Sequence, residues 1–251
     1  MYIRFTHNNQ EKEGFLDNGT VRVLNGRMLE GGTPGTETVP LDNIKLLAPC
    51  QPSKVVCVGL NYKDHAEEMN MEMPKEPLLF MKPSTSVIGH NDPIIAPPQS
   101  KQLDYEGELA IVIGRQAKDV NANDAGDYIF GYSCANDFTA RDLQLGDKQW
   151  TRGKSFDTFC PIGPGIVPTI NERDARIALT VNGELRQSSN LNQLIFSTHE
   201  IVSYVSAQMT LLPGDVILTG TPHGVGPVVV GDTMSISIDG IGVLTNKLAQ
   251  V

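Results

Sequence analysis

Two glutamates near the middle of the chain have the side-chain type and the spacing to hold a metal ion. Glu106 and Glu108 are two residues apart, so both side chains lie on one face of an extended strand. The apolar, β-branched run at 109–114 follows directly and indicates a buried strand. The two carboxylates are therefore expected at the edge of the core. Because like charges repel there, a Lys, an Arg or a divalent metal ion must lie beside them.

A third acid, Asp137, favours the metal ion. It ends a short β-like segment that starts at Tyr132, and a helical turn is predicted just after it. Three carboxylates with several waters suit Mg²⁺ or Mn²⁺, which prefer oxygen ligands. A lone Glu-x-Glu pair is more often a solvated strand face, so the surroundings of this pair decide between the two interpretations.

A histidine and a glutamate lie together on a second predicted element. His65 and Glu68 are three residues apart in a helix that is predicted after a buried strand, and they are neighbours on one helix face. A carboxylate beside a histidine fixes its tautomer and stabilises the imidazolium, which predicts a general base. The alternative is a solvated helix face. The Met-rich segment 69–74 is predicted to be a short helix, and we expect residues 61–74 to form a lid.

The cationic and amide side chains that follow are candidates for binding an anion. Arg141 and Gln144 share a predicted helix face, where a guanidinium and an amide can hold a carboxylate with several donors. Pairing of the arginine with a surface acid is the alternative. Lys154 lies in a Gly-containing segment and is the second cation that we place in the site. The Gly-rich turn that contains Thr221 offers backbone N–H groups and hydroxyls to an anion.

Length and composition restrict the classes of function. The 251 residues allow one large domain, or a main domain with a small appendage. The formal charge of −9 is spread along the chain, which argues against a broad nucleic-acid interface or docking on an anionic membrane. We therefore expect a small-molecule partner, with no nucleic acid and no membrane.

Cysteine usage and hydropathy indicate the compartment. The four cysteines are far apart in the sequence and form no CxxC pair, so we expect reduced core residues rather than zinc ligands or disulfides. The first residues lack the apolar region of a signal peptide, and no apolar run approaches transmembrane length. The expected location is cytoplasmic.

The elements that must position these side chains are mostly strands. Residues 1–48 alternate apolar and polar positions around Gly-containing turns, which predicts a small N-terminal β-hairpin unit that ends in a loop from Gly31. Pro49 and Pro52 mark its boundary with a catalytic domain at 49–251. That domain is predicted to contain further short strands and a helix at 194–208 that covers a sheet.

Taken together, the motifs resemble the fumarylacetoacetate hydrolase family over about residues 50–249. The segments that carry the resemblance are Gly59-Leu60-Asn61-Tyr62 with His65 and Glu68, Asp104-Tyr105-Glu106-Gly107-Glu108-Leu109, Gly131-Tyr132 with Asn136-Asp137, Thr139-Ala140-Arg141-Asp142, Gly153-Lys154-Ser155-Phe156-Asp157, Pro213-Gly214-Asp215, and Thr219-Gly220-Thr221-Pro222-His223-Gly224-Val225-Gly226. The resemblance implies an α+β, mainly β fold, a mixed β-roll of several small sheets with a few outer helices. It also implies a homodimer and a bound Mg²⁺ or Mn²⁺.

The resemblance also implies roles for the candidate residues. The metal ligands would be Glu106, Glu108 and Asp137, the catalytic residues His65, Glu68 and Lys154, and the substrate contacts Arg141, Gln144 and Thr221. One departure is clear, because the large founding hydrolase uses a further acidic metal ligand upstream of its catalytic histidine. The strand at 55–60 offers no acid here. The missing acid makes the chain similar to the short bacterial branch of the family, which is the branch of acylpyruvate hydrolases and 2-hydroxyhepta-2,4-diene-1,7-dioate isomerase-like proteins.

The implied chemistry leaves several functions open. In the first, the metal stabilises a pyruvate enolate while the carbon–carbon bond of an acylpyruvate-type 2,4-dioxo acid is hydrolysed. Oxaloacetate decarboxylation and the isomerisation of an unsaturated 2-hydroxy acid pass through a similar enolate. The presence of both His65 and Glu68 favours hydrolysis. A binding protein without turnover is the alternative from another class, and it would need only the metal ligands.

Overall fold

A long mixed sheet joins the N-terminal part of the chain to the rest of the molecule in the computed structural model, which describes residues 1–250. Its order is β4-β3-β2-β1-β14-β12-β11-β17-β6-β7, with β5 paired to β1 and β8 to β14. The strands are β1 (Tyr2–His7), β2 (Gln10–Asp17), β3 (Thr20–Asn25), β4 (Thr33–Pro40), β5 (Lys45–Leu46), β6 (Lys54–Val58), β7 (Leu79–Pro83), β8 (Val87–Ile88), β11 (Gly107–Ile113), β12 (Ile129–Asn136), β14 (Cys160–Val167) and β17 (Val216–Leu218).

Two smaller sheets and a few short helices complete the fold. One sheet has the order β13-β10-β18 and the other β16-β15-β19-β20-β9. Their strands are β9 (Ile94–Ala96), β10 (Leu103–Tyr105), β13 (Thr139–Ala140), β15 (Arg176–Val181), β16 (Glu184–Asn190), β18 (Gly226–Val228), β19 (Thr233–Ile238) and β20 (Gly242–Gln250). The α-helices are α1 (Lys63–Glu68), α2 (Arg141–Asp147), α3 (Thr151–Lys154) and α4 (Thr198–Gln208), and the 3-10 helices are η1 (Met28–Glu30), η2 (Leu41–Asn43), η3 (Ser84–Ser86), η4 (Ala122–Tyr128) and η5 (Leu191–Gln193). The predicted mainly β class with several mixed sheets is confirmed.

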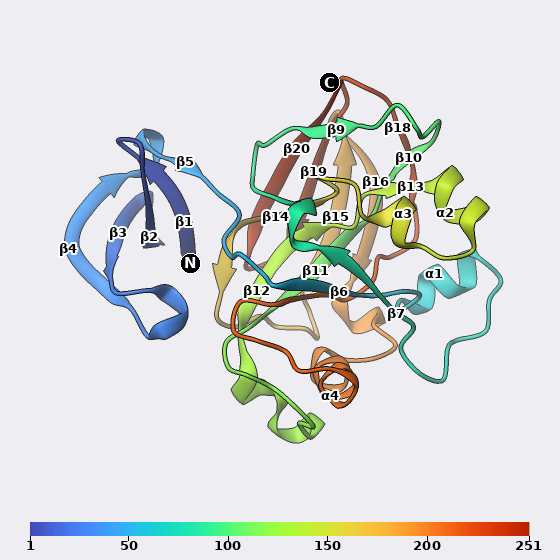
Figure 1. Cartoon of the computed structure of the whole chain (residues 1–251), viewed down its shortest axis with the longest axis horizontal. Helices are drawn as coiled ribbons and strands as arrows, with labels where there is room; N and C mark the ends of the chain where they lie inside the picture. The colour runs from blue at the N-terminus through green and yellow to red at the C-terminus, as the bar shows by residue number, and fades with distance from the viewer. Residues whose placement is uncertain (251) are drawn as a thin grey trace.

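The first five strands lie on one side of the molecule, and α1, α2 and α3 lie on the opposite side (Figure 1). A β-bridge between Tyr2 of β1 and Ile166 of β14 connects the two parts of the long sheet. The expected loop from Gly31 is wrong for residues 33–40, which form β4. This strand buries only Val39, so it lacks the alternating pattern that identifies a strand, and it is held by backbone pairing to β3.

Two predicted helices have different ends in the structure. The helix expected at 69–74 is wrong, because α1 stops at Glu68 and Asn70 adopts a left-handed φ of 52°. The Met71 N–H then donates to the Ala66 carbonyl, which is the hydrogen bond of a helix C-terminus. The last helix, α4, begins at Thr198 rather than at residue 194, because Ser197 and Glu200 form a capping box there.

Strand β11 is the centre of the core and is buried along its whole length. Leu109 and Ile111 pack in one hydrophobic cluster, whereas Ala110 and Val112 pack in a second cluster on the opposite face. Burial of both faces explains why the run is continuously apolar. By strand alternation Glu108 lies on the face of Ala110, so the strand carries a carboxylate directly into the core.

The remaining expectations on the chain concern cysteines and membranes. All four cysteines are buried and free, as predicted. Among residues 1–250, no helix is long and apolar enough to cross a membrane.

A buried carboxylate connects the starts of β17 and β6. Asp215 accepts hydrogen bonds from the Ser53 hydroxyl at 2.6 Å, from the Leu212 N–H at 2.8 Å and from the Lys54 ammonium. Its side chain is completely buried. Burial raises the pKa of this carboxyl, but the hydrogen bonds from Lys54, Ser53 and Leu212 outweigh that effect and hold the pKa below its ordinary value.

We predict that Asp215→Asn lowers the free energy of unfolding at pH 7 by about 2–4 kcal/mol, because the half-buried Lys54 loses its charged partner and the buried hydrogen bonds of Asp215 are weakened. A lowered folded-state pKa means that the stabilisation is present above the ordinary carboxyl pKa and is lost as the pH falls through the folded-state value. The difference from wild type should therefore shrink between about pH 5 and pH 3. Urea unfolding at several pH values measures the difference in free energy of unfolding between variant and wild type. The exposed Asp124→Asn is the control. A difference that stays constant down to pH 3 would contradict the assignment.

Candidate active site

The structure brings the three predicted metal ligands together. Glu106 lies between β10 and β11, Glu108 lies in β11, and Asp137 follows β12. Gly107 pairs with Asn136 in the β11–β12 ladder, and the Asp137 N–H donates to the Glu106 carbonyl at 2.9 Å. One carboxylate oxygen from each acid lies within 4.8 Å of the others, and all three side chains are buried. Strand register therefore assembles a compact cluster of oxygen ligands.

Three buried or half-buried cations contact this cluster. The Lys154 ammonium donates to Glu106 Oε2 at 2.8 Å and to Asp137 Oδ2 at 2.6 Å. Lys82, which lies in β7, donates to Asp137 Oδ1 at 2.5 Å. Arg141 contacts Glu106 through Nη2 and Asp104 through Nε, the second at 2.8 Å. The expected cationic neighbours are thus present as side chains.

The cations do not neutralise the three acids equally. Burial raises the pKa of Glu106, but Lys154 and Arg141 outweigh it and lower the pKa to about 2. By contrast, burial together with the charges of Asp137 and Glu106 raises the pKa of Glu108 well above its ordinary value. Glu108 accepts one hydrogen bond, from the Gly220 N–H at 2.7 Å. Glu108 is therefore the acid of the cluster whose ionised form an added positive charge would stabilise most.

The donor set fits a hard divalent cation. All the ligand atoms are carboxylate oxygens, which suits Mg²⁺ or Mn²⁺ better than a thiophilic metal. The charge count also favours a bound cation. Asp104 and the three cluster acids make four carboxylates, whereas the cations are three, Lys82, Arg141 and Lys154. The buried charges alone therefore sum to about −1 when every acid is ionised.

The predicted histidine–glutamate pair also forms. His65 Nδ1 lies 2.9 Å from Glu68 Oε2 on α1, and the Gly224 N–H donates to Glu68 Oε1 at 3.2 Å. Because Nδ1 is engaged by the carboxylate, Nε2 is the nitrogen that can exchange a proton with a substrate or a water. The loop that contacts Glu68 at Gly224 contacts Glu108 at Gly220, so it connects the dyad to the acidic cluster.

The predicted substrate contacts lie around the same centre. Arg141 Nη1 donates to Gln144 Oε1 at 2.5 Å on α2. The Thr221 hydroxyl donates to the Gly107 carbonyl at 3.0 Å and accepts from Gln187 Nε2 at 2.8 Å. The structure therefore places Arg141 and Gln144 beside Glu106, and Thr221 beside Gly107, which lies between the two glutamates in sequence.

Two site residues were not predicted from the sequence. Lys82 is almost completely buried in an otherwise apolar strand, and a lysine at that position was the available signal. Gln187 is the buried residue of the largely exposed strand β16, and its side chain accepts the Gly107 N–H at 2.9 Å. Nothing in its local pattern distinguishes it from scaffold.

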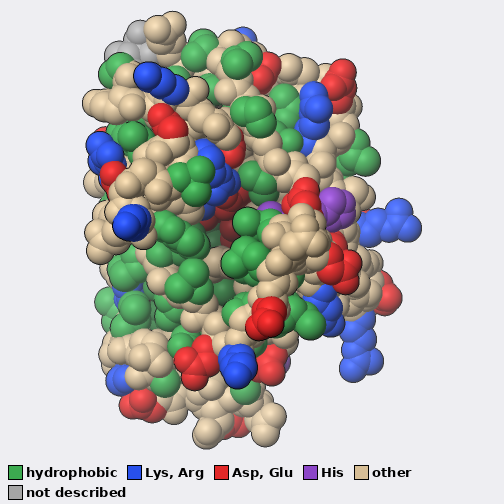
Figure 2. Space-filling model, turned by 90° about the vertical axis from the view of Figure 1, so that its right-hand side faces the viewer, with side chains coloured by type: hydrophobic (Ala, Val, Ile, Leu, Met, Phe, Trp, Pro, Cys, Tyr) green, Lys and Arg blue, Asp and Glu red, His purple; other side chains and the backbone are tan. Residues whose placement is uncertain are grey.

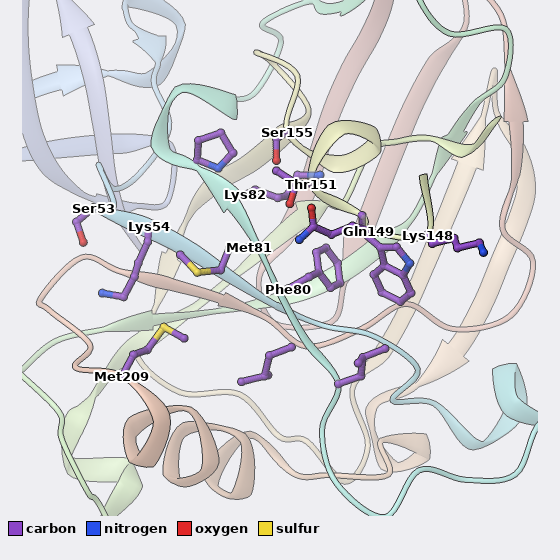
Figure 3. Close-up of a pocket in the computed structure, with 14 residues that line it drawn as sticks. Ser53, Lys54, Phe80, Met81, Lys82, Lys148, Gln149, Thr151, Ser155 and Met209 are labelled. Atoms are coloured by element: carbon purple, nitrogen blue, oxygen red, sulfur yellow. The ribbon is translucent and has the colours of Figure 1, made fainter. Parts of the chain in front are cut away.

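The acidic side chains form the floor of a hollow on the face that carries α1, α2 and α3 (Figure 2). Lys or Arg and His side chains lie beside them in this view. A cavity of about 870 Å³ lies along β7, and its lining contains Phe80, Lys82, Trp150 and Met209 (Figure 3). Lys82 connects it to the cluster through Asp137, but no acid lines the cavity itself, so the candidate active site is the acidic hollow.

Comparison with known proteins agrees with this geometry. The family model described as fumarylacetoacetate (FAA) hydrolase C-terminal matches residues 54–249, and one described as Rv2993c-like, N-terminal matches residues 1–49. The mitochondrial oxaloacetate tautomerase Fahd2a of Rattus norvegicus is 46% identical over 93% of this chain and 78% of its own length.

Solved structures show the same relationship. A 2-hydroxyhepta-2,4-diene-1,7-dioate isomerase from Mycobacterium marinum is 43% identical, with a TM-score of 0.92 over 99% of this chain and 98% of that chain. A fumarylpyruvate hydrolase from Pseudomonas aeruginosa, in complex with Mn²⁺ and pyruvate, is 36% identical, with a TM-score of 0.76 over 86% of this chain and 93% of that chain. The chain therefore belongs to the fumarylacetoacetate hydrolase family.

Proposed function

We propose that this chain is a metal-dependent enzyme that acts on small 2-oxo acids through their enolates, with His65 moving the proton. The observation that carries the proposal is the pairing of His65 with Glu68 on an element connected by one loop to the acidic cluster. A protein that only bound a metal or a ligand would need the acids but not this dyad. The geometry thus favours turnover over the binding alternative.

The proposed metal ligands are Glu106, Glu108 and Asp137, with Mg²⁺ or Mn²⁺ as the ion. When bound, the ion would supply positive charge that stabilises the enolate oxygen and orients the neighbouring carboxylate. The Mn²⁺ and pyruvate bound to the related fumarylpyruvate hydrolase support this choice of ion and ligand class. Two added positive charges would change the buried total from about −1 to about +1, which favours an anionic substrate.

The first proposed reaction is hydrolysis of the carbon–carbon bond of an acylpyruvate-type 2,4-dioxo acid. His65 takes a proton from a water molecule that attacks the distal carbonyl, while Glu68 holds Nδ1 and stabilises the imidazolium. Arg141 and Gln144 bind the substrate carboxylate, and Lys154 faces the negative charge that develops on the enolate oxygen. Thr221 contributes a hydroxyl beside the carboxylate.

The second candidate is keto–enol tautomerisation of oxaloacetate. The similarity of this chain to oxaloacetate tautomerases supports this candidate. In that reaction His65 carries a proton between the carbon and the oxygen of the same enolate. Isomerisation of an unsaturated 2-hydroxy acid, which the similarity to a 2-hydroxyhepta-2,4-diene-1,7-dioate isomerase supports, would use the same proton transfer. Oxaloacetate decarboxylation uses the dyad least, because it requires only an electron sink and a later proton donor.

Residues 61–74 are proposed to be a lid over this site. Met69, Met71 and Met73 are more than half exposed, at 52%, 52% and 58%, so the segment after α1 has little packing of its own. Closure over a bound substrate would cover these side chains and exclude bulk water from the enolate.

Two further features of the chain are proposed from the same resemblance. Residues 1–48 would be an N-terminal β unit, and residues 49–251 would form the catalytic domain. The chain would act as a homodimer. Strand β7 is the last strand in the order of the long sheet. Leu78, directly before it, and Met81, within it, are exposed and line the cavity of Figure 3. An exposed apolar edge of this kind supports an interface on that side.

We predict that Glu108→Gln abolishes the rise in melting temperature that Mg²⁺ or Mn²⁺ produces in the wild type. The substitution removes one ligand of the proposed ion and at the same time removes a buried carboxylate that Asp137 and Glu106 repel. The metal-free variant should therefore melt at the same temperature as the metal-free wild type or higher. Thermal scans with and without each ion measure both effects. The exposed Glu67→Gln is the control. An unchanged metal response in Glu108→Gln would contradict the assignment of Glu108 as a metal ligand.

We predict that His65→Gln lowers kcat on an acylpyruvate by at least about a hundredfold, since general-base assistance is worth about 10²–10⁴. The variant should lose oxaloacetate tautomerisation as well, yet retain much more of any oxaloacetate decarboxylation. Glu68→Gln should lie between it and the wild type. Parallel assays of pyruvate release, enol disappearance and CO₂ release separate these reactions. Equal losses in all three would show that the dyad serves lid closure rather than proton transfer.

The proposed homodimer predicts a mass in solution of about twice the 27.3 kDa of one chain. Light scattering on the eluate of a sizing column measures it, and Met81→Glu should lower the mass by placing a charge at the apolar edge. A wild-type mass of one chain at micromolar concentration would contradict the homodimer. A dimer that is insensitive to Met81→Glu would place the interface elsewhere.

A further inference from the structure

Helix α1 carries the proposed general base but is weakly anchored by itself. It has six residues, and Tyr62 at its N-cap position provides no side-chain capping bond within the described structure. A helix of this length is unstable without tertiary contacts. The position of His65 therefore depends on the side chains that attach α1 to the rest of the molecule.

Two acids on one face of α1 make these attachments. Asp64 and Glu68 are four residues apart, so they lie on the same side of the helix. Asp64 Oδ2 accepts a hydrogen bond from the hydroxyl of Ser189 in β16 and lies 3.2 Å from His223 Nδ1. Glu68 accepts from the Gly224 N–H. Adjacent residues of one loop thus contact both acids.

The contact between Asp64 and His223 is not complete in this position of the helix. The structure shows four buried side-chain polar atoms without a hydrogen-bond partner among residues 1–250, and three of them are Tyr62 Oη, Asp64 Oδ1 and His223 Nδ1. Unpaired buried polar groups are unfavourable and rare. Their concentration at α1 indicates that a small movement of the helix would form a better set of bonds.

We propose that His223 and Asp64 form a positioning pair that seats α1 over the active site when His223 is cationic. The charged imidazole attracts Asp64, draws the Asp64 side of α1 toward the loop and so fixes the position of His65, while the buried Tyr62 holds the start of the helix. The pair touches neither the substrate nor the metal ligands. It rests on the proposed function because it acts through His65.

Charged and titratable groups face His223 from α1 and β10. From α1, the acids Asp64 and Glu68 face the loop, and His65 is already bonded to Glu68. From β10, the Tyr105 hydroxyl donates to the Gly224 carbonyl at 3.0 Å.

One arginine belongs to a strand that packs against this loop. The Arg186 carbonyl of β16 lies close to Gly224, and the Arg186 guanidinium is bonded to Glu184 at 2.9 Å.

The sign of the pH dependence follows from the chemistry of imidazole. Histidine ordinarily changes charge between about pH 5 and pH 8. A histidine that gains an acidic partner contributes stabilisation that is present at low pH and is lost as the pH rises through its folded-state value. The helix should therefore be held more firmly at pH 6 than at pH 8. Because the two side chains are 43% and 22% exposed, the effect should be about two- to fivefold.

Hydrogen exchange of the backbone amides at 62–70 tests the pair without relying on turnover. Protection factors, corrected for the intrinsic pH dependence of exchange, are compared at pH 6 and pH 8 with Mg²⁺ and oxalate, a mimic of the pyruvate enolate. Wild type should be about two- to fivefold more protected at pH 6. His223→Gln and Asp64→Asn should lose this difference, whereas His223→Lys should keep the high protection at both pH values. The control is His7→Gln, in the N-terminal β unit.

The outcomes separate this inference from the proposed function. Equal protection of wild type at both pH values, or an unchanged pH response in His223→Gln, would overturn the positioning pair even if the enzyme is active. If His65→Gln retains full activity but the pH response of α1 follows the prediction, the proposed role of His65 is wrong and the pair stands. In the active enzyme, His223→Lys should also shift the alkaline limb of the kcat profile to higher pH, which a purely structural role would not do.

Discussion

Burial of Glu108 between two other carboxylates is the constraint on which the rest of the site depends. Strand β11 is buried on both faces, so this acid cannot reach bulk water, and Glu106 and Asp137 repel its charge. Three elements supply cations to the cluster, namely β7 with Lys82, α2 with Arg141 and α3 with Lys154. They neutralise Glu106 and Asp137 more than Glu108. The fold thereby keeps a local demand for positive charge in a dry, preorganised position, which is what a divalent ion in an enolate-stabilising site requires.

The loop after β17 connects the acidic cluster to helix α1. Gly220 donates to Glu108 and Gly224 donates to Glu68, and both adopt left-handed φ values of 97° and 90°. A Cβ at Gly224 would lie 2.3 Å from the Arg186 carbonyl, so the close approach of this loop to β16 needs glycine. The same short segment therefore fixes a proposed metal ligand, Glu108, and the carboxylate that contacts His65. This arrangement explains how binding at the acids can be coupled to the position of the base.

Local periodicity predicts two pairs of this site, whereas the resemblance to the family placed Asp137, Lys154 and Thr221 in it. The spacing of Glu106 and Glu108 on a strand, and of His65 and Glu68 on a helix, determines each pair before any tertiary contact is known. Lys82 and Gln187 were missed because their roles depend on which strands become neighbours. The sequences of β7 and β16 alone do not determine how these strands pair. The helix expected at 69–74 failed for a related reason. Asn70 takes a left-handed conformation that ends α1, and this stop signal was overlooked because Met and Glu around it are good helix formers.

The central claim is that the metal-loaded site forms the enolate of a 2-oxo acid. Exchange of the methyl protons of pyruvate for deuterium, followed by NMR in D₂O, tests this step alone, without water attack or carbon–carbon cleavage. The account predicts exchange that requires Mg²⁺ or Mn²⁺ and that falls to the rate of the metal-ion control when Glu108 is replaced by Gln. Metal-loaded wild type that binds pyruvate but exchanges its protons no faster than the free ion does would contradict it.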